Sequence, residues 1–143
     1  MQITKRFEFD AGHRVTYHKA KCRSLHGHRY CLEVTIKGEI IDKSGHPSQG
    51  MVVDFADLKR FINNNVIEEL DHCFIVWQED KKLISFLQDD GSKHLVVPFV
   101  PTVENLCLYI RKRIESLLSQ SECTNLKLAN IRLFETPNSW ADA

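Results

Sequence analysis

Alternating apolar and polar residues predict two strands near the N-terminus. The first alternation runs from Phe7 to His13 and the second, the longest in the chain, from His26 to Lys37. A period of two residues is typical of a strand with one buried face. The residues on the predicted buried faces are Phe7, Phe9, Ala11 and His13 in the first strand, and His26, His28, Tyr30, Leu32, Val34 and Ile36 in the second.

Two later segments have the spacing of amphipathic helices. In residues 54–70 the apolar positions recur every three or four residues behind Asp54, a suitable N-cap. In residues 102–119 a longer apolar stripe follows Thr102, which has the same capping chemistry. Both segments are therefore expected to pack one apolar face on the sheet.

The remaining segments are less regular. Residues 73–100 have no clear period, and Pro98 limits the apolar run around it to a short edge strand. Residues 126–135 return to a strand-like alternation, and a short tail closes the chain. The order β, β, α, α, β, with room for a further short strand at either uncertain segment, predicts one α+β domain over residues 1–143, with two helices on one face of a mostly antiparallel sheet.

Composition narrows the class of protein. The chain has 19 Lys and Arg against 19 Asp and Glu, which gives no electrostatic reason to expect nucleic acid or a membrane surface as a partner. No apolar run approaches the ~20 residues of a membrane span, and none resembles a signal peptide. The five cysteines are an odd number without a CxxC pair, which favours the reducing cytoplasm over a disulfide framework.

Three histidines are expected to meet at one end of the predicted hairpin. His26 and His28 are two residues apart, so both imidazoles point to one face of their strand. His13 ends the first strand, and in an antiparallel pair this end lies beside the start of the second. Three imidazoles with an open fourth position are the ligands of a catalytic zinc ion, whereas Cys22 as a fourth ligand would make a closed structural site.

Six motifs resemble one enzyme family. They are FDAGH (9–13), CRSLHGH (22–28), GMVVDFADLK (50–59), LDH (70–72), PTVENL (101–106) and ETPNSW (135–140). Together they resemble the 6-pyruvoyl-tetrahydropterin synthase superfamily, most closely its bacterial branch, the 6-carboxy-tetrahydropterin synthases of the queuosine pathway. Three residues separate Cys22 from the HGH motif, the spacing of the carboxy-forming branch, whereas the animal pyruvoyl synthases have a longer gap.

The resemblance implies a fold and a set of site residues. The fold would be the T-fold (tunnelling fold), a ββααββ unit that forms homo-oligomeric barrels with active sites at subunit interfaces. The implied site residues are His13, His26 and His28 as zinc ligands, Cys22 as the catalytic base, Asp71 and His72 as aids to proton transfer, Glu135 as an active-site carboxylate, and Thr102 with Glu104 at the wall of the pterin site.

The resemblance also implies a reaction. A lyase of this branch converts 7,8-dihydroneopterin triphosphate to 6-carboxy-5,6,7,8-tetrahydropterin and releases acetaldehyde and triphosphate. Elimination of triphosphate alone, which gives the pyruvoyl product, is an alternative. Two further alternatives are a non-catalytic zinc module and a zinc hydrolase. A hydrolase would leave the thiol of Cys22, so near the metal, without a role.

The chemistry of individual residues supports parts of this scheme. Lys21 and Arg23 flank Cys22, and positive charge beside a thiol lowers its pKa. Glu135 shares the parity of apolar neighbours, so its carboxylate is expected to face inward, where it can accept the N–H groups of a pterin. Neighbouring side chains ordinarily diverge, so no contact within the 71–72 pair is predicted, and the histidine there is equally explained by the helix C-terminus.

Three further questions stay open in the sequence. The segment of residues 78–98 is longer than expected for compact bacterial members, so it is interpreted as a surface excursion. The triphosphate of the implied substrate also needs cations to bind it. Exposed strand edges predict a homo-oligomer of unspecified size. The basic candidates for the triphosphate, among which the sequence does not choose, are Arg14, Lys19, Lys21, Arg23 and Arg29.

Overall fold

One six-stranded sheet organises this computed structural model, which describes residues 1–121 and 125–143. The strands are β1 (Gln2–His13), β2 (His26–Lys37), β3 (Cys73–Trp77), β4 (His94–Val97), β5 (Lys127–Thr136) and β6 (Ser139–Asp142). Their order is β4-β3-β1-β2-β5-β6. The pairs β1–β2, β2–β5 and β5–β6 are antiparallel, whereas β1–β3 and β3–β4 are parallel. The prediction of a mostly antiparallel sheet is confirmed.

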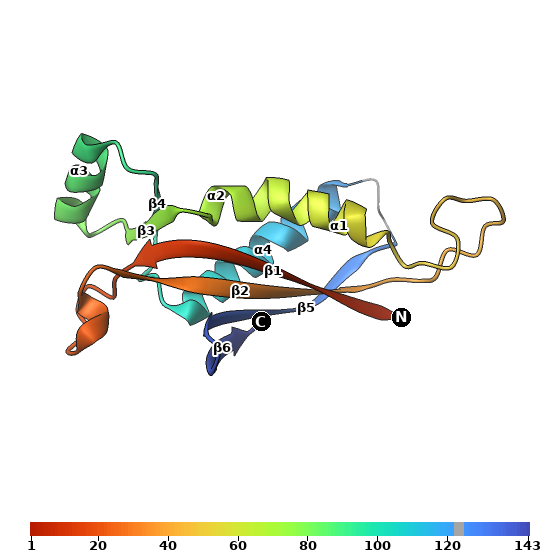
Figure 1. The fold of residues 1–143 in the computed structure, drawn as a ribbon, viewed down its shortest axis with the longest axis horizontal. Coiled ribbons are helices and arrows are strands. Elements are labelled where there is room, and N and C mark those ends of the chain that lie inside the picture. Colours follow the sequence, from red (N-terminus) through yellow and green to blue (C-terminus); the bar gives the residue numbers. More distant parts are fainter. Residues whose placement is uncertain (122–124) are drawn as a thin grey trace.

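The predicted helices form and begin at the predicted caps. The helical elements are η1 (Lys21–Arg23), α1 (Phe55–Ile62), the π-helical turn η2 (Asn63–Ile67), α2 (Glu68–Leu70), α3 (Lys81–Asp90) and α4 (Val103–Gln120). The Asp54 carboxylate accepts the N–H of Ala56 at 2.7 Å, and the Thr102 hydroxyl accepts that of Asn105 at 3.4 Å. In Figure 1, α1 and α2 belong to one continuous rod that runs along the sheet.

The core lies between these helices and the inward face of the hairpin. Its fully buried residues include Leu32, Val34 and Ile36 of β2, Ile62 of α1, and Ile110 and Ile114 of α4. Each such side chain contributes about 1.5–3 kcal/mol by leaving water. Since α1 and α4 share one core, they cover one face of the sheet, and the predicted α+β class is confirmed.

Residues 73–100, left without a clear assignment by their pattern, extend the sheet. β3 leads through α3 to β4, so this segment is a parallel βαβ unit beside β1 and more than a surface excursion. Leu83 and Leu87 are the buried residues of α3, and they form a small cluster with Val76 of β3. Two buried positions make too weak a periodic pattern to predict this helix from the sequence. β4 precedes Pro98 and forms the edge of the sheet, as predicted.

The C-terminal tail, to which the residue pattern assigned no element, forms the short strand β6 against β5. In the described residues, Cys22, Cys31, Cys73 and Cys107 are free thiols, the last three buried, and Cys123 lies outside the described residues. None of the helices in the described ranges combines the length and apolarity needed to cross a membrane.

Candidate metal centre

The three predicted ligands meet at the end of the β1–β2 hairpin. His13 pairs with His26 across the two strands, and His28 lies opposite Ala11, so all three imidazoles project from the inward face. One ligand nitrogen from each histidine lies within 4.8 Å of the others. Ring centroids are 4.5 Å apart for His13 and His26 and 5.1 Å for His26 and His28. The predicted convergence is confirmed by this geometry.

Backbone carbonyls orient two of the rings. His13 Nδ1 lies 2.6 Å from the carbonyl oxygen of Pro101, and His26 Nδ1 lies 2.7 Å from that of Ser24. A carbonyl only accepts, so each Nδ1 carries the hydrogen and each Nε2 keeps its lone pair. A histidine that binds a metal ordinarily donates its other N–H in this way. Sequence reasoning missed both carbonyls, because a main-chain acceptor leaves no signal in residue type.

The remaining ring nitrogens fit a cation. The Nε2 atoms of His13 and His28 are buried and have no hydrogen-bond partner within the described chain. Leaving a buried polar atom unpaired costs about 1–3 kcal/mol, so such an arrangement indicates a missing ligand. Burial lowers the pKa of both histidines, which keeps the imidazoles neutral and able to bind a metal.

Glu135, at the end of β5, adds a carboxylate beside the histidines. Its Oε1 lies 3.5 Å from Nε2 of His13 and 3.9 Å from Nε2 of His28, and its side chain is 24% exposed. The inward orientation predicted from its parity is therefore present. A cavity of about 420 Å³ lies next to it and is lined by Arg6, Glu8, Gly27, His28, Arg29, Cys31, Phe134, Glu135, Thr136 and Pro137.

Cys22 lies in the connection between β1 and β2, on η1, and is partly buried. Its carbonyl oxygen accepts the N–H of Val15 at 2.8 Å, which closes the connection on itself. Its sulfur is not among the ligand atoms that gather within 4.8 Å in the described part of the chain. The sequence left undecided whether Cys22 completes a closed four-ligand metal site. In this arrangement it does not.

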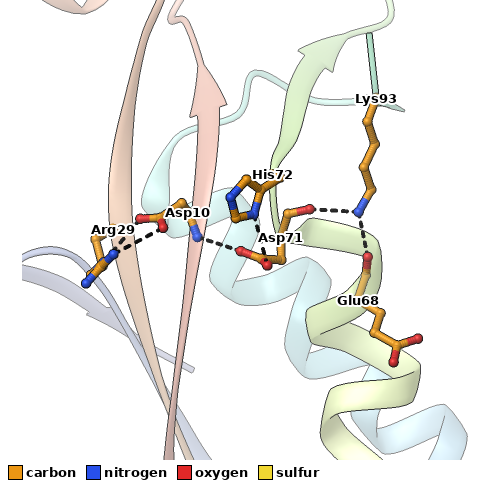
Figure 2. A network of polar contacts seen from close by, with 6 residues as sticks. All are labelled: Asp10, Arg29, Glu68, Asp71, His72 and Lys93. Atoms are coloured by element: carbon orange, nitrogen blue, oxygen red, sulfur yellow. Dashed lines mark hydrogen bonds and ion pairs between the residues drawn. The ribbon is translucent and has the colours of Figure 1, made fainter.

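Asp71 and His72 do contact each other (Figure 2). His72 Nδ1 lies 3.0 Å from Asp71 Oδ2, and His72 has a backbone φ of 55°, in the left-handed region. Asp10 imposes this turn: its N–H donates to Asp71 Oδ1 at 2.9 Å, and its carbonyl accepts the N–H of His72 at 2.7 Å. The N–H of Asp10 is also the main reason that the pKa of Asp71 is lowered. Neighbouring side chains were expected to diverge, and the positive φ is why they do not.

This pair is not joined to the histidine cluster. The side chains of His72 and Asp71 are 78% and 39% exposed, and no hydrogen bond or ion pair in the described residues connects them to the three ligands. Lys93, the residue before β4, donates to the carbonyls of Glu68 and Asp71 at 2.6 and 2.7 Å and so holds this turn (Figure 2).

The predicted pocket-wall residues lie on the start of α4. Thr102 follows Pro101, whose carbonyl orients His13, but its hydroxyl is used as the N-cap. Glu104 is exposed in the first turn of the helix, where the dipole favours an acidic residue. The structure thus places Thr102 beside the site, whereas Glu104 makes no hydrogen bond or ion pair with the site residues in the described part of the chain.

Two of the five basic candidates for the triphosphate are already paired. Arg14 forms an ion pair with Asp80 at 2.6 Å, and Arg29 forms one with Asp10 at 3.2 Å. Lys19, Lys21 and Arg23 are exposed and form no ion pair among the residues that the structure describes.

Comparison with known proteins identifies the family. The family model described as 6-pyruvoyl tetrahydropterin synthase matches residues 2–143. The 6-carboxy-5,6,7,8-tetrahydropterin synthase of Rickettsia bellii is 39% identical over 143 residues, which cover 99% of each chain.

Solved structures have the same fold. An uncharacterized protein from Wolinella succinogenes superposes with a TM-score of 0.76 at 26% identity, covering 100% of this chain and 97% of the other. The 6-pyruvoyl tetrahydropterin synthase of Caenorhabditis elegans superposes with a TM-score of 0.68 at 24% identity, covering 100% and 94%. The predicted T-fold and enzyme class are confirmed, and the chain belongs to the 6-pyruvoyl tetrahydropterin synthase family.

Proposed function

We propose that this enzyme is a zinc-dependent 6-carboxy-5,6,7,8-tetrahydropterin synthase of queuosine biosynthesis. It converts 7,8-dihydroneopterin triphosphate to 6-carboxy-5,6,7,8-tetrahydropterin with release of acetaldehyde and triphosphate. The observation that carries the proposal is the cluster of His13, His26 and His28, in which two buried Nε2 atoms lack a hydrogen-bond partner in the described residues, next to a carboxylate and a cavity. The carboxy product is favoured by the Rickettsia bellii relative and by the three residues between Cys22 and the HGH motif.

His13, His26 and His28 would hold the zinc ion, whose nitrogen preference matches this donor set. When bound, zinc acts as a Lewis acid that lowers the pKa of the substrate's side-chain hydroxyls. Glu135 would anchor the pterin, because a carboxylate accepts the two parallel N–H groups of that ring. Glu135 and His28 both line the adjoining cavity, which supports a place for the ring there, and the other lining residues of β1 and β2 belong to the outward face of the sheet.

Proton transfer would be performed by Cys22 and His72. Cys22 removes the substrate proton as the general base, and it lies on the short helix η1 between Lys21 and Arg23. Asp71 accepts the Nδ1 hydrogen of His72 and leaves Nε2 to exchange protons with the substrate.

The Asp71–His72 pair would reach the metal centre of a neighbouring copy. Both side chains are exposed and unconnected to their own chain's cluster, which supports an active site built at the interface of a homo-oligomer. The edge strands β4 and β6 carry backbone groups that a second copy can pair with. The four described cysteines are free thiols, in keeping with a cytoplasmic enzyme.

Product analysis tests the proposal. Purified enzyme is incubated with 7,8-dihydroneopterin triphosphate, and the pterin and acetaldehyde are measured by mass spectrometry and by a coupled assay. We expect 6-carboxy-tetrahydropterin and acetaldehyde in equal amounts, and no product from the Cys22→Ala variant. A pyruvoyl product without acetaldehyde would replace the carboxy assignment, and no turnover by the zinc-loaded enzyme would refute the proposal.

A further inference from the structure

One carboxylate outside the histidine cluster is buried in the fold. Asp80, which follows β3 and precedes α3, is 6% exposed, and only His13 joins it among buried polar residues of the described chain. A carboxylate is rarely buried without a partner. Its environment therefore indicates a contact that the fold requires.

The partner comes from the connection that carries Cys22, residues 14–25, here called the cysteine loop. Arg14 donates from Nε to Oδ2 of Asp80 and from Nη2 to Oδ1, both at 2.6 Å, and Thr16 donates to Oδ2 at 3.3 Å. This two-pronged pairing fixes direction as well as distance. The hydrogen bond from Arg14 is the main cause of the lowered pKa of Asp80.

The cysteine loop has little else to hold it. No residue from 14 to 25 is buried, so the loop has no core of its own. Besides the Asp80 contacts, the rings of Tyr17 and Trp77, the last residue of β3, meet edge to face with centroids 5.8 Å apart, and the carbonyl of Ser24 accepts from Nδ1 of His26 at the start of β2. Figure 1 places this loop and α3 at the same end of the sheet. The βαβ unit therefore supports the N-terminal part of the loop, residues 14–17, from outside.

The path from Asp80 to Cys22 is short. Arg14 directly follows the ligand His13, and Val15 donates its N–H to the carbonyl of Cys22 at 2.8 Å. A clamp on Arg14 thus holds the backbone to which Cys22 is bonded. The same backbone leads from the metal ligand on β1, so the clamp relates the thiol to the histidines.

We infer that Asp80 is a positioning residue, which clamps Arg14 and Thr16 and thereby sets the place of Cys22 relative to the three histidines. The inference rests on the proposed function, because the place of Cys22 matters for turnover only if Cys22 is the base. It also assigns a role to the βαβ unit. A misplacement of about 1 Å at a catalytic group can cost about 100-fold in rate, so a modest loosening of the loop is measurable.

Asp80→Asn tests the inference, because asparagine keeps the shape but loses the charge and one acceptor. Arg14→Lys keeps the positive charge but loses the pair of hydrogen bonds that the guanidinium donates to Asp80. The control is Asp142→Asn. It disrupts the two hydrogen bonds, 2.7 and 3.0 Å long, that the Arg132 guanidinium of β5 donates to the Asp142 carboxylate of β6. Hydrogen exchange of residues 14–25, zinc content, kcat and KM are measured for each variant.

We expect Asp80→Asn to speed exchange in the cysteine loop by about tenfold and to lower kcat by about tenfold or more, with KM and zinc content near wild type. Arg14→Lys should have smaller effects in the same direction, and Asp142→Asn none on the loop or on kcat. Unchanged loop exchange would overturn the clamp. Equal acceleration across the whole chain, or loss of zinc, would overturn the positioning role in favour of a purely structural one.

The exchange measurement needs no substrate. If the wild-type enzyme shows no synthase turnover, the proposed function fails, while the loop exchange of Asp80→Asn still decides whether the clamp exists. If turnover is present and Asp80→Asn loosens the loop without lowering kcat, the clamp stands but the positioning role is wrong.

Discussion

At the scale of residues, the metal centre depends on what each imidazole nitrogen contacts. His13 is 1% exposed and gives its Nδ1 hydrogen to the carbonyl of Pro101, and its Nε2 has no hydrogen-bond partner among the described residues. His94 provides a contrast, because its Nδ1 also lies 2.7 Å from a carbonyl, that of Ser92, but it lies outside the cluster. His13 has two other imidazoles beside it that could bind the same metal ion, whereas His94 is not part of such a group in the described residues.

His13→Ala is expected to lower zinc affinity by at least about 100-fold, because two histidines bind zinc far less tightly than three. Metal content after dialysis against a chelator measures this. His94→Ala is the control and should retain zinc. Cys22→Ala should retain it too if the thiol is not a ligand. Loss of zinc from the cysteine variant would restore the closed four-ligand site as the better interpretation.

At the scale of elements, the end of the α1–α2 rod is held from a distant strand. Lys93, immediately before β4, donates to two carbonyls at the end of the rod, where a cation also interacts favourably with the helix dipole. The next residue, His72, then adopts its left-handed backbone against Asp10 of β1 (Figure 2). The end of the rod, Lys93 before β4 and Asp10 of β1 therefore together fix the position of the His72 imidazole.

Lys93→Met is expected to destabilise the protein by about 0.5–1 kcal/mol, because two charge-assisted but exposed hydrogen bonds are lost. Urea unfolding measures the change, and exchange of the amide of His72 should accelerate more than that of core amides. Lys82→Met, at an exposed position on α3, is the control and should have no such effect. Equal behaviour of the two variants would show that Lys93 does not hold the turn.

At the scale of the whole molecule, one chain carries two separate halves of the proposed site. The histidine cluster with Cys22 lies at the end of the hairpin, and the exposed Asp71–His72 pair is not bonded to it. An interface between copies would bring the halves together without any change of fold. The two edges of the sheet provide places for such contacts.

Mixing two inactive variants tests this arrangement. Cys22→Ala and His72→Ala subunits, dissociated and reassembled together in equal amounts, should recover about one quarter of wild-type activity, since each shared site takes each residue from a different copy at random. Each variant reassembled alone is the control. Mixed oligomers without any recovered activity would place both residues in one subunit's site.

The sequence by itself determined the features that depend on local period and chemistry. The alternation in β1 and β2 and the caps at Asp54 and Thr102 are visible in residue type alone, because burial on one face and the need to satisfy helix N–H groups restrict which residues are used. The convergence of His13, His26 and His28 followed from strand parity and antiparallel pairing.

The tertiary structure alone decided the contacts made by the backbone or across long separations. Arg14 and Asp80 are 66 residues apart, and nothing in either neighbourhood selects the other. The Asp71–His72 contact requires a positive φ that Asp10 imposes from another strand, against the local preference of a non-glycine residue. Side-chain pattern reports what one element buries, whereas these contacts arise only when separate elements are packed together.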